Sequence, residues 1–381
     1  MQRVTAWLSR FVAYPSLHAL HAHAAWILHT HLADCFDNTP RIAFLSVEPG
    51  SGKSRALDVT EPLVPDPVLT VNVSVSYLFR RIAVEEGAPL PTVLFDEIDS
   101  VFSKRASEST EQIRGLLNSG YRRGATVGRT VIQGKELRAE EWPSFCPVAL
   151  AGLDDMPDTL MTRSIVVRMR KRSPSEIIEP FRPRVERAAA AALRRDIERW
   201  SREVRPGMLD VWPELPEGIT DRNADVWEPL IAVADAAGGP WPELLRAAAV
   251  EMVAEQGQRP PTVGIRLLAD IRTVMAEHPV MRTSDLLGAL HGMETAPWGS
   301  MLGGLPIDAR YLARRLAKYD SPTSNTVRVG SGVAKGDALH HFADAWARYL
   351  PPVAAPPAGA EPTNPGSSAP QLIEPRDDEP F

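Results

Sequence analysis

Residues 46–54 read Ser-Val-Glu-Pro-Gly-Ser-Gly-Lys-Ser, between an apolar run over 41–47 and a helical pattern that starts at Lys53. In such a turn the glycines allow backbone N–H groups to face a polyphosphate at the helix N-terminus, where the helix dipole favours negative charge. Lys53 can reach the β- and γ-phosphates, and the Ser54 hydroxyl can ligate Mg²⁺. Val47 stands where the full phosphate-loop pattern has its first glycine, so an ordinary glycine-rich turn is the alternative. The segment predicts a nucleotide site formed by Pro49, Gly50, Ser51, Gly52, Lys53, Ser54 and Arg55.

A second motif is the apolar run Thr92–Phe95, which is followed directly by Asp96 and Glu97. In phosphate-loop enzymes a carboxylate at the end of this strand holds Mg²⁺, and a neighbouring carboxylate can polarise the attacking water. The alternative is a strand that ends in a solvated acidic turn. Two motifs in the expected order, each at the end of a strand, favour the enzyme. We therefore expect an ATPase with ATP and Mg²⁺ as cofactors, in which Asp96 holds the metal and Glu97 activates water.

The first 170 residues alternate between short apolar runs and helical patterns. The runs typical of buried strands cover residues 41–47, 68–73, 92–95, 147–151 and 164–169. A helical pattern over 5–36 precedes them, and further ones lie between them at 53–61, 76–86 and 108–119. Strands that alternate with helices predict a mostly parallel, doubly wound sheet. The expected fold class is therefore α/β, with a P-loop NTPase αβα core.

Three further regions follow this core, which we expect to span residues 1–173. Residues 174–280 are helical in pattern and predict an all-helical lid. Residues 281–350 combine short helices with a strand pair near 326–329, whereas residues 351–381 hold nine prolines and five acidic residues. Such a tail buries too little apolar surface to offset its ordering entropy, so we expect it to be disordered.

Composition limits the classes of function. The 381 residues carry 42 basic and 48 acidic side chains, a net charge of −6, which excludes a uniformly basic coat for nucleic acid. The two cysteines exclude a disulfide scaffold and a multi-cysteine zinc site. No window reaches the roughly 18 consecutive apolar residues of a membrane span. We expect a cytoplasmic protein with no membrane partner.

Basic side chains nevertheless gather in two places. Residues 103–138 carry eight basic and three acidic side chains, and residues 164–172 add four basic ones with no acid. These side chains could contact nucleic-acid phosphates or a nucleotide bound by a neighbouring subunit. A solvated face is the alternative.

The helical pattern over 306–319 places Arg310, Arg314 and Lys318 on one face, with apolar residues opposite. A strand and turn follow over 326–332, and a closing helix comes after them. This arrangement resembles a winged helix-turn-helix, which can dock on DNA. A packing module with a wet basic face is the alternative. We therefore predict a small winged-helix-like C-terminal domain.

Five histidines between positions 18 and 31 suggest a metal site. They are His18, His21, His23, His29 and His31. No cysteine or acidic residue stands at ligand spacing from them apart from the more distant Asp34 and Cys35, so a core or surface helix is the better interpretation. We expect no metal site beyond that for Mg²⁺.

With these motifs in place, the chain resembles an uncharacterised P-loop ATPase domain of actinobacteria and their phages, which commonly follows primase-polymerase modules in replication proteins. The resembling segments run from about residue 10 to residue 350: SVEPGSGKSRALD, TVLFDEIDSVF, IRGLLNSGYRRGATVGR, VALAGLDDMPDTLMTRSIVVRMRKR, DRNADVWEPLIAVADAAGG, IRLLADIRTVM and FADAWARYL. The resemblance implies a replication partner. Because the chain starts almost at the ATPase core, we expect any priming to come from another polypeptide, such as a primase-polymerase.

More distantly, the order of motifs is similar to that of AAA-type ATPases. That resemblance implies a homo-oligomeric ring, commonly a hexamer, in which Arg163 is the arginine finger that reaches the γ-phosphate of the next subunit. It also implies that Arg266 contacts the nucleotide of its own subunit, with Arg222 as the weaker candidate.

One departure from that family concerns the strand over 147–151. It ends in Gly152 and Leu153, without the polar residue usual at this strand's tip. The way in which water is oriented there is therefore open. Asp154 or Asn118 could substitute.

Together these features predict Mg²⁺-dependent ATP hydrolysis by a ring-forming motor coupled to DNA, single-stranded or forked. The expected role is that of a replicative helicase or helicase-like translocase of a phage or mobile element. One alternative is a helicase loader or remodelling ATPase that acts on a partner protein. Another is a winged-helix DNA-binding regulator that uses ATP as a switch. The set of Lys53, Asp96 and Glu97 favours the motor, because a pure switch has no need of Glu97.

Overall fold

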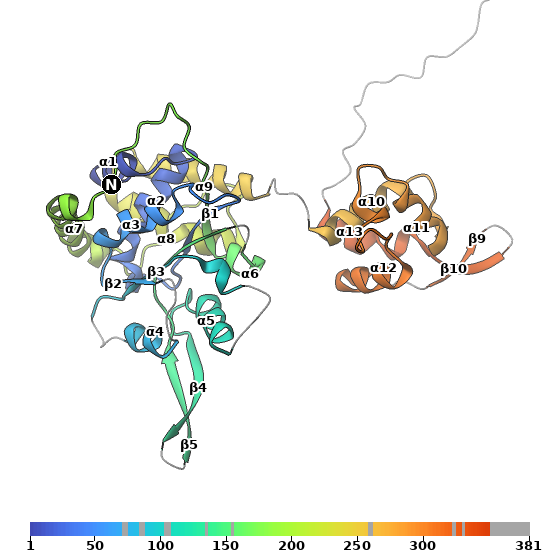
Figure 1. The fold of residues 1–381 in the computed structure, drawn as a ribbon, viewed down its shortest axis with the longest axis horizontal. Coiled ribbons are helices and arrows are strands. Elements are labelled where there is room, and N and C mark those ends of the chain that lie inside the picture. Colours follow the sequence, from blue (N-terminus) through green and yellow to red (C-terminus); the bar gives the residue numbers. More distant parts are fainter. Residues whose placement is uncertain are drawn as a thin grey trace, which may run out of the picture. The chain divides into compact units, whose positions relative to one another are not determined.

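The computed structural model describes residues 1–70, 75–83, 88–102, 108–133, 136–153, 156–257, 262–321, 325–329 and 332–350. The chain divides into two compact units, one formed by residues 1–259 and the other by residues from 260 onward. Figure 1 shows both units and labels their helices and strands where there is room. The predicted tail over 351–381 lies outside the described residues.

A five-stranded parallel sheet forms the centre of the first unit, in the order β2-β3-β6-β1-β7. Its strands are β1 (Arg41–Ser46), β2 (Pro67–Thr70), β3 (Thr92–Phe95), β6 (Val148–Leu153) and β7 (Ser164–Arg168). Each strand corresponds to one predicted apolar run, which confirms the α/β class and the parallel sheet. Of the predicted run over 68–73, residues 71–73 lie outside the described part. All five strands end at the same edge, here called the carboxyl edge; the opposite edge is the amino edge.

Both faces of this sheet are buried, which explains why its strands are apolar throughout rather than alternating. In β1, Ile42 and Phe44 belong to one hydrophobic cluster, whereas Ala43 and Leu45 belong to another. Strands β6 and β7 divide their residues between the two clusters in the same way. The clusters lie on opposite faces because successive side chains of a strand point in opposite directions.

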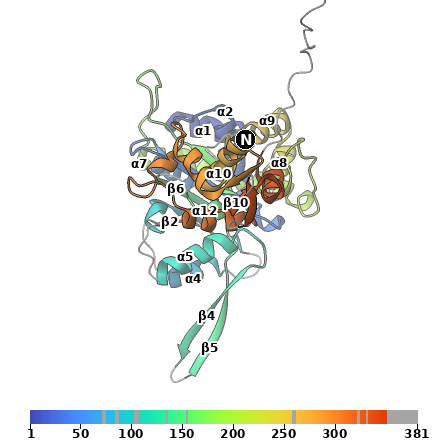
Figure 2. The same ribbon diagram turned by 90° about the vertical axis from the view of Figure 1, so that its right-hand side faces the viewer.

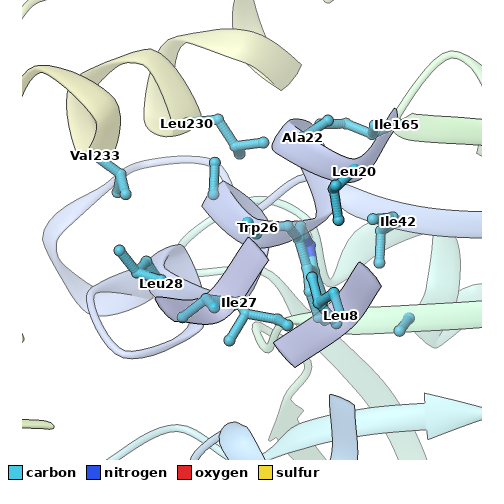
Figure 3. Close-up of a cluster of buried hydrophobic side chains, with 14 of the residues drawn as sticks. Leu8, Leu20, Ala22, Trp26, Ile27, Leu28, Ile42, Ile165, Leu230 and Val233 are labelled. Carbon is cyan, nitrogen blue, oxygen red and sulfur yellow. The ribbon is translucent and has the colours of Figure 1, made fainter. Parts of the chain in front are cut away.

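Six helices contribute to the first cluster. They are α1 (Gln2–Phe11), α2 (Leu17–Thr30), α3 (Lys53–Thr60), α7 (Pro183–Val204), α8 (Asp221–Ala237) and α9 (Trp241–Gly257). Figure 3 shows Trp26 of α2 beside Leu8 of α1 and Ile42 of β1, with Leu230 and Val233 of α8 nearby. The predicted separate lid over 174–280 is thus corrected: α7, α8 and α9 share one core with the sheet, because their apolar faces pack on it and on α2.

The predicted helical stretch over 5–36 is two helices, α1 and α2, separated at Pro15. Helix α2 is apolar on almost every side because it is enclosed by α1, α8, α9 and the sheet. The indole N–H of Trp26 donates to the carbonyl of Pro40 at 2.8 Å, so its one polar group is satisfied. Among the described residues, no helix is both long and apolar enough to cross a membrane.

The second cluster covers the other face of the sheet with α4 (Val75–Ile82), α5 (Glu108–Ser119) and α6 (Asp158–Met161). A long antiparallel hairpin of β4 (Thr126–Gln133) and β5 (Glu136–Pro143) leads directly toward β6. Figures 1 and 2 both show this hairpin extending beyond α4 and α5. Its base is anchored by Val127 and Trp142, which pack against the second cluster. Neither of these two strands was predicted from the residue pattern.

The second unit has its own hydrophobic core. Its elements are α10 (Val263–Met275), β8 (Val280–Arg282), α11 (Thr283–His291), α12 (Ala309–Leu316), β9 (Thr326–Val329), β10 (Gly332–Ala338) and α13 (Ala343–Tyr349). The three strands form an antiparallel sheet in the order β8-β10-β9. The predicted boundary between 280 and 281 is corrected to 259/260, because Leu268 and Ile271 of α10 are buried in this core with Trp298 and Phe342.

Candidate functional site

The glycine-rich loop connects β1 to the N-terminus of α3 at the carboxyl edge. Gly50 and Gly52 have φ values of +76° and +88°, in the left-handed region that glycine adopts without steric cost. The Ser51 hydroxyl donates to Ser46 Oγ at 2.8 Å, and Lys53 Nζ donates to the same Ser46 oxygen at 2.6 Å. The lysine ammonium is thereby held over the loop that is predicted to take phosphate.

The other predicted loop residues lie on the same turn. Pro49 is exposed, and Ser54 is exposed in the first turn of α3. Arg55 Nε lies 3.4 Å from Asp58 Oδ2, an ion pair within the same helix. Val47 is 78% exposed, so the residue at the position of the missing glycine points away from the core.

The predicted carboxylates follow β3 at the same edge of the sheet. The backbone N–H of Asp96 donates to the carbonyl of Thr70 in β2 at 2.9 Å, and Asp96 Oδ1 accepts the N–H of Glu97 at 2.9 Å. Glu97 has a φ of +56°, an unusual conformation for a long side chain. Such strain is typical of functional turns. It ends the strand abruptly and leaves the Glu97 side chain exposed.

The two motifs are electrostatically coupled. Partial burial lowers the pKa of Lys53 below its ordinary value, and the carboxylates of Asp99 and Asp96 oppose that shift. The loop after β1 and the turn after β3 thus face the same space, although β6 lies between their strands in the sheet. From the sequence, Asp99 was only the first alternative to Glu97 for activating water; the spacing Asp-Glu-Ile-Asp was the available signal for its place at the site.

The tip of β6 lies between the two motifs. The N–H of Leu153 donates to Asp99 Oδ1 at 3.0 Å. Of the two substitutes considered for the missing polar residue, Asp154 lies outside the described residues. Asn118 stands at the end of α5, next to Leu117, whose carbonyl lies 3.5 Å from the guanidinium of Arg41 at the start of β1. Asn118 is thus at the amino edge, and that suggestion is wrong.

A cavity of about 380 Å³ adjoins the glycine-rich loop. Its walls come from the start of α2, the ends of β1 and β7, and the end of α9. Ser16, Val47, Met169, Met252 and Glu255 are among the residues that line it. This cavity could not be predicted from the sequence, because its walls are far apart along the chain.

Arg163 lies at the amino edge, immediately before β7. Its carbonyl accepts the N–H of Arg41 at 3.0 Å, its guanidinium donates to the carbonyl of Thr159 at 2.5 Å, and it lies 4.7 Å above the ring of Tyr121. At about 3.3 Å of rise per residue, the length of β7 separates this side chain from the glycine-rich loop of its own chain by roughly 16 Å. Arg163 is therefore remote from the loop in its own subunit.

Arg222, the weaker candidate for a contact with nucleotide in the same subunit, is also at the amino edge. Its guanidinium lies 3.4 Å from Thr162 Oγ1. It lines a small cavity of about 90 Å³ together with Arg163, Tyr121 and Asp225. The suggestion that it serves the loop of its own chain is corrected, because the start of α8 packs beside the amino ends of the strands.

Arg266 belongs to α10 in the second unit. Its guanidinium donates to the carbonyl of Thr295 and lies 3.9 Å from Asp270. Its predicted contact with nucleotide stays a prediction.

The basic residues of 103–138 have several different roles. Arg114 donates to the carbonyl of Val101 at 3.1 Å, and Arg123 donates to the carbonyl of Phe36 at 3.0 Å. Arg129 and Arg138 lie on the two strands of the hairpin, whereas Lys135 is outside the described residues. Two of these arginines therefore support local structure, and two lie on a projecting element.

The predicted basic face of the C-terminal helix is present on the second unit. Helix α12 is shorter than the predicted 306–319, and Lys318 lies in the 3₁₀ turn that follows it. Arg310, Arg314 and Lys318 are all exposed, whereas Leu312 is fully buried. The amphipathic pattern thus correctly identified which side of the helix meets solvent.

The histidines of α2 and the turn after it are mainly core residues. His23 bonds Tyr14 and Thr60, at 2.6 and 2.8 Å, and His31 Nε2 bonds the carbonyl of Leu63 at 2.8 Å. Burial lowers the pKa of His23 to about 3 and that of His31 to about 4, so both are neutral at pH 7. Within the described part of the chain, no three His, Cys, Asp or Glu side chains are grouped to hold a metal ion.

Comparison with known proteins identifies relatives of this chain. A family model described as "Protein of unknown function (DUF3631)" matches residues 168–349. The chain is also 40% identical over 185 residues to a Saccharopolyspora erythraea protein named "Uncharacterized 28.9 kDa protein in xis 5'region"; the match covers 48% of this chain and 69% of that protein. The family model begins after the glycine-rich loop and the carboxylates, so it carries no information on them.

Proposed function

The chain belongs to the family described as Protein of unknown function (DUF3631), and on that premise we propose that its first unit is a Mg²⁺-dependent P-loop ATPase with an AAA-like αβα core. The observation that carries the proposal is the placement of both motifs at the carboxyl edge, with the glycine-rich loop after β1 and the carboxylates after β3 on either side of β6. The sheet order, with the strand of the loop and the strand of the carboxylates separated by one other, supports the same class. Ligands bind at the carboxyl ends of strands in open α/β sheets.

The residues of the glycine-rich loop suit a triphosphate. Gly50 has open space where a Cβ would be, so backbone N–H groups can approach an anion closely. Lys53 supplies the positive charge, and Ser54 with Asp96 supplies oxygen ligands of the kind that Mg²⁺ prefers. Mg²⁺ held by Ser54 and Asp96 would neutralise negative charge on the phosphates. The adjoining cavity of about 380 Å³ is the space that we assign to the nucleoside.

In hydrolysis, Glu97 orients and polarises the attacking water, because it follows the Mg²⁺ carboxylate and is exposed toward solvent. Arg163 is too far from its own loop to act there, and so serves the γ-phosphate of a neighbouring subunit. Arg222 lies beside it and belongs to the same face. The proposal thus includes a homo-oligomeric ring in which each site is completed by the next copy.

Two elements support DNA as the partner of this motor. The hairpin β4–β5 extends from the first unit and carries Arg129 and Arg138. In the second unit, the order α10, β8, α11, α12, β9, β10 and the antiparallel sheet support a winged-helix domain, with α12 as its DNA-facing helix. The relative's name locates that protein in a xis 5' region, which supports a phage or mobile element as the source. We therefore propose a cytoplasmic replicative helicase or translocase.

The winged-helix topology also favours a second candidate, a DNA-binding regulator that uses ATP as a switch. The two functions differ in what DNA does to ATP turnover. A motor hydrolyses ATP faster when single-stranded or forked DNA is present and assembles into larger particles with a non-hydrolysable ATP analogue. A regulator binds a specific duplex site and keeps that binding without hydrolysis. ATPase rates with and without DNA, together with particle size, decide between them.

Replacing Lys53 by alanine is expected to remove ATP binding. The phosphates lose their only point charge in the loop, and a hydrogen bond to a charged group contributes about 1.5–3 kcal/mol, which is more than tenfold in affinity. Titration with a fluorescent ATP analogue measures the effect. Lys335→Ala, on a strand of the second unit, is the matched control and should bind normally. ATP affinity in Lys53→Ala equal to that of the wild type would disprove the loop assignment.

Reversing Arg314 and Lys318 to glutamate is expected to weaken DNA binding and flatten its salt dependence. Each lost phosphate contact lowers the slope of log K against log salt by about one unit, so the double change removes about two. Arg187→Glu with Arg195→Glu, at exposed positions of α7 in the first unit, imposes the same change in net charge and is the control. An unchanged salt slope in the α12 variant would show that this helix does not contact DNA phosphates and has only a packing role.

A further inference from the structure

Gly152, next to the last residue of β6, has no room for a side chain. A Cβ added to Gly152 would lie 2.7 Å from Ile98 Cγ2 and 3.1 Å from Asp99 Oδ1. The first of these distances is shorter than real contacts of a Cβ atom, and Ile98 is fully buried, so a side chain here would displace the turn that holds it. Glycine at this position is thus required by the turn that follows β3, and the absence of a polar side chain on the strand tip has a steric cause.

The turn that fills this space brings a carboxylate to the same place. Asp99 lies in a 3₁₀ turn over Ile98–Ser100, and its Oδ1 accepts the N–H of Leu153 at 3.0 Å. The buried Ile98 fixes the turn from below. The Asp99 side chain is exposed, and its carboxylate favours the charged form of Lys53, which opposes the lowering of the lysine pKa by burial.

We propose that Asp99 supplies, at the tip of β6, the polar group that the strand itself cannot carry, and that it orients the attacking water together with Glu97. This inference rests on the proposed ATPase function. In the reaction, the water oxygen bonds to the γ-phosphorus and the bond from that phosphorus to the β–γ bridging oxygen breaks. ADP leaves with the bridging oxygen, and the water proton passes to Glu97. Asp99 accepts a hydrogen bond from that water and is a positioning residue.

A purely structural role for Asp99 makes different predictions from a role in positioning water. If its only task is to accept the N–H of Leu153, then Asp99→Asn should behave normally, because the amide oxygen accepts the same bond. If it positions water, Asp99→Asn should lower kcat by about 10²-fold, the size of effect that a misplaced reactant produces. The KM for ATP and the melting temperature should both stay at the wild-type values.

Gly152→Ala tests the same geometry from the other side. The added methyl group meets Ile98 and displaces the turn, so kcat should fall in the same way as in Asp99→Asn. Because both changes would misplace the same attacking water, the double variant should lose little more than either single variant. Gly115→Ala is the matched control, since its Cβ has open space and its backbone is helical.

The measurements are kcat, KM for ATP and melting temperature of the full chain and these variants. A fall in kcat for Asp99→Asn at unchanged KM and stability supports the inference. Unchanged kcat in Asp99→Asn, beside an active wild-type protein, overturns the inference alone. A wild-type protein that neither binds nor hydrolyses ATP overturns the proposed function and this inference with it.

Discussion

The Arg163→Ala protein is expected to hydrolyse ATP about 10³–10⁵-fold more slowly than the wild type, the range that an arginine supplied in trans contributes in GTPases. The guanidinium spreads the negative charge that develops on the transferred phosphoryl group. Because Arg163 lies at the amino edge of the sheet, its guanidinium would contact the phosphoryl group bound by a second copy of the chain. ATP binding to the variant's own loop should therefore be unchanged.

Mixing variants tests the action in trans. Arg163→Ala subunits keep a complete loop, and Lys53→Ala subunits keep a complete finger. A mixture of these two inactive proteins should regain activity at the junctions where an intact loop meets an intact arginine. Lys53→Ala mixed with the Lys53→Ala/Arg163→Ala double variant is the control, because no junction in it is complete.

Arg163 also has a structural role, which has to be distinguished from its expected role in hydrolysis. Its side chain stacks on Tyr121 and donates to the carbonyl of Thr159, so its loss could loosen the start of β7. The melting temperature of Arg163→Ala reports that loss directly. A stable variant that shows no recovery in any mixture, although its subunits exchange, would contradict the finger.

The Glu97→Gln protein is expected to bind ATP and turn it over about 10²–10⁴-fold more slowly, the usual contribution of a general base. The amide keeps the shape of the side chain and the turn, but it cannot accept the proton of the attacking water. The variant should therefore accumulate as the ATP-bound assembly. Single-turnover kinetics and particle size with ATP measure both effects.

Glu48→Gln is the matched control for this variant. Glu48 is also an exposed glutamate at the carboxyl edge, but it belongs to the glycine-rich loop and not to the turn after β3. Its replacement should leave turnover close to the wild-type rate. Near-normal turnover in Glu97→Gln would transfer the role of the base to Asp99.

The sequence alone was sufficient to identify the central sheet. A run such as Arg41–Ser46 is apolar at every position because both faces of its strand are buried, and this signal is local. The glycine-rich loop could also be predicted locally. Glycine is the residue that adopts the left-handed backbone found at Gly50 and Gly52 without steric cost. The exposed face of α12 was equally predictable, because the spacing of apolar and charged residues along a helix is a local feature of the sequence.

The long-range arrangement was decided by the tertiary structure. The boundary of the two units lies at 259/260 because α10 buries its apolar face in the core of the second unit. The pattern of an amphipathic helix shows which face is buried, but not in which core. The hairpin β4–β5 was missed because its strands mix charged and apolar residues without a regular alternation along the chain.

The details of the site depended most on tertiary contacts. From sequence, Gly152 was a strand tip that lacked a polar residue; in the fold, the turn after β3 occupies that space and Asp99 stands there instead. Arg222 was a candidate for the loop of its own chain, yet α8 places it beside Arg163 at the opposite edge. Residue type and spacing determine what a side chain can do chemically. The edge of the sheet on which it acts is set by packing between segments far apart in the chain.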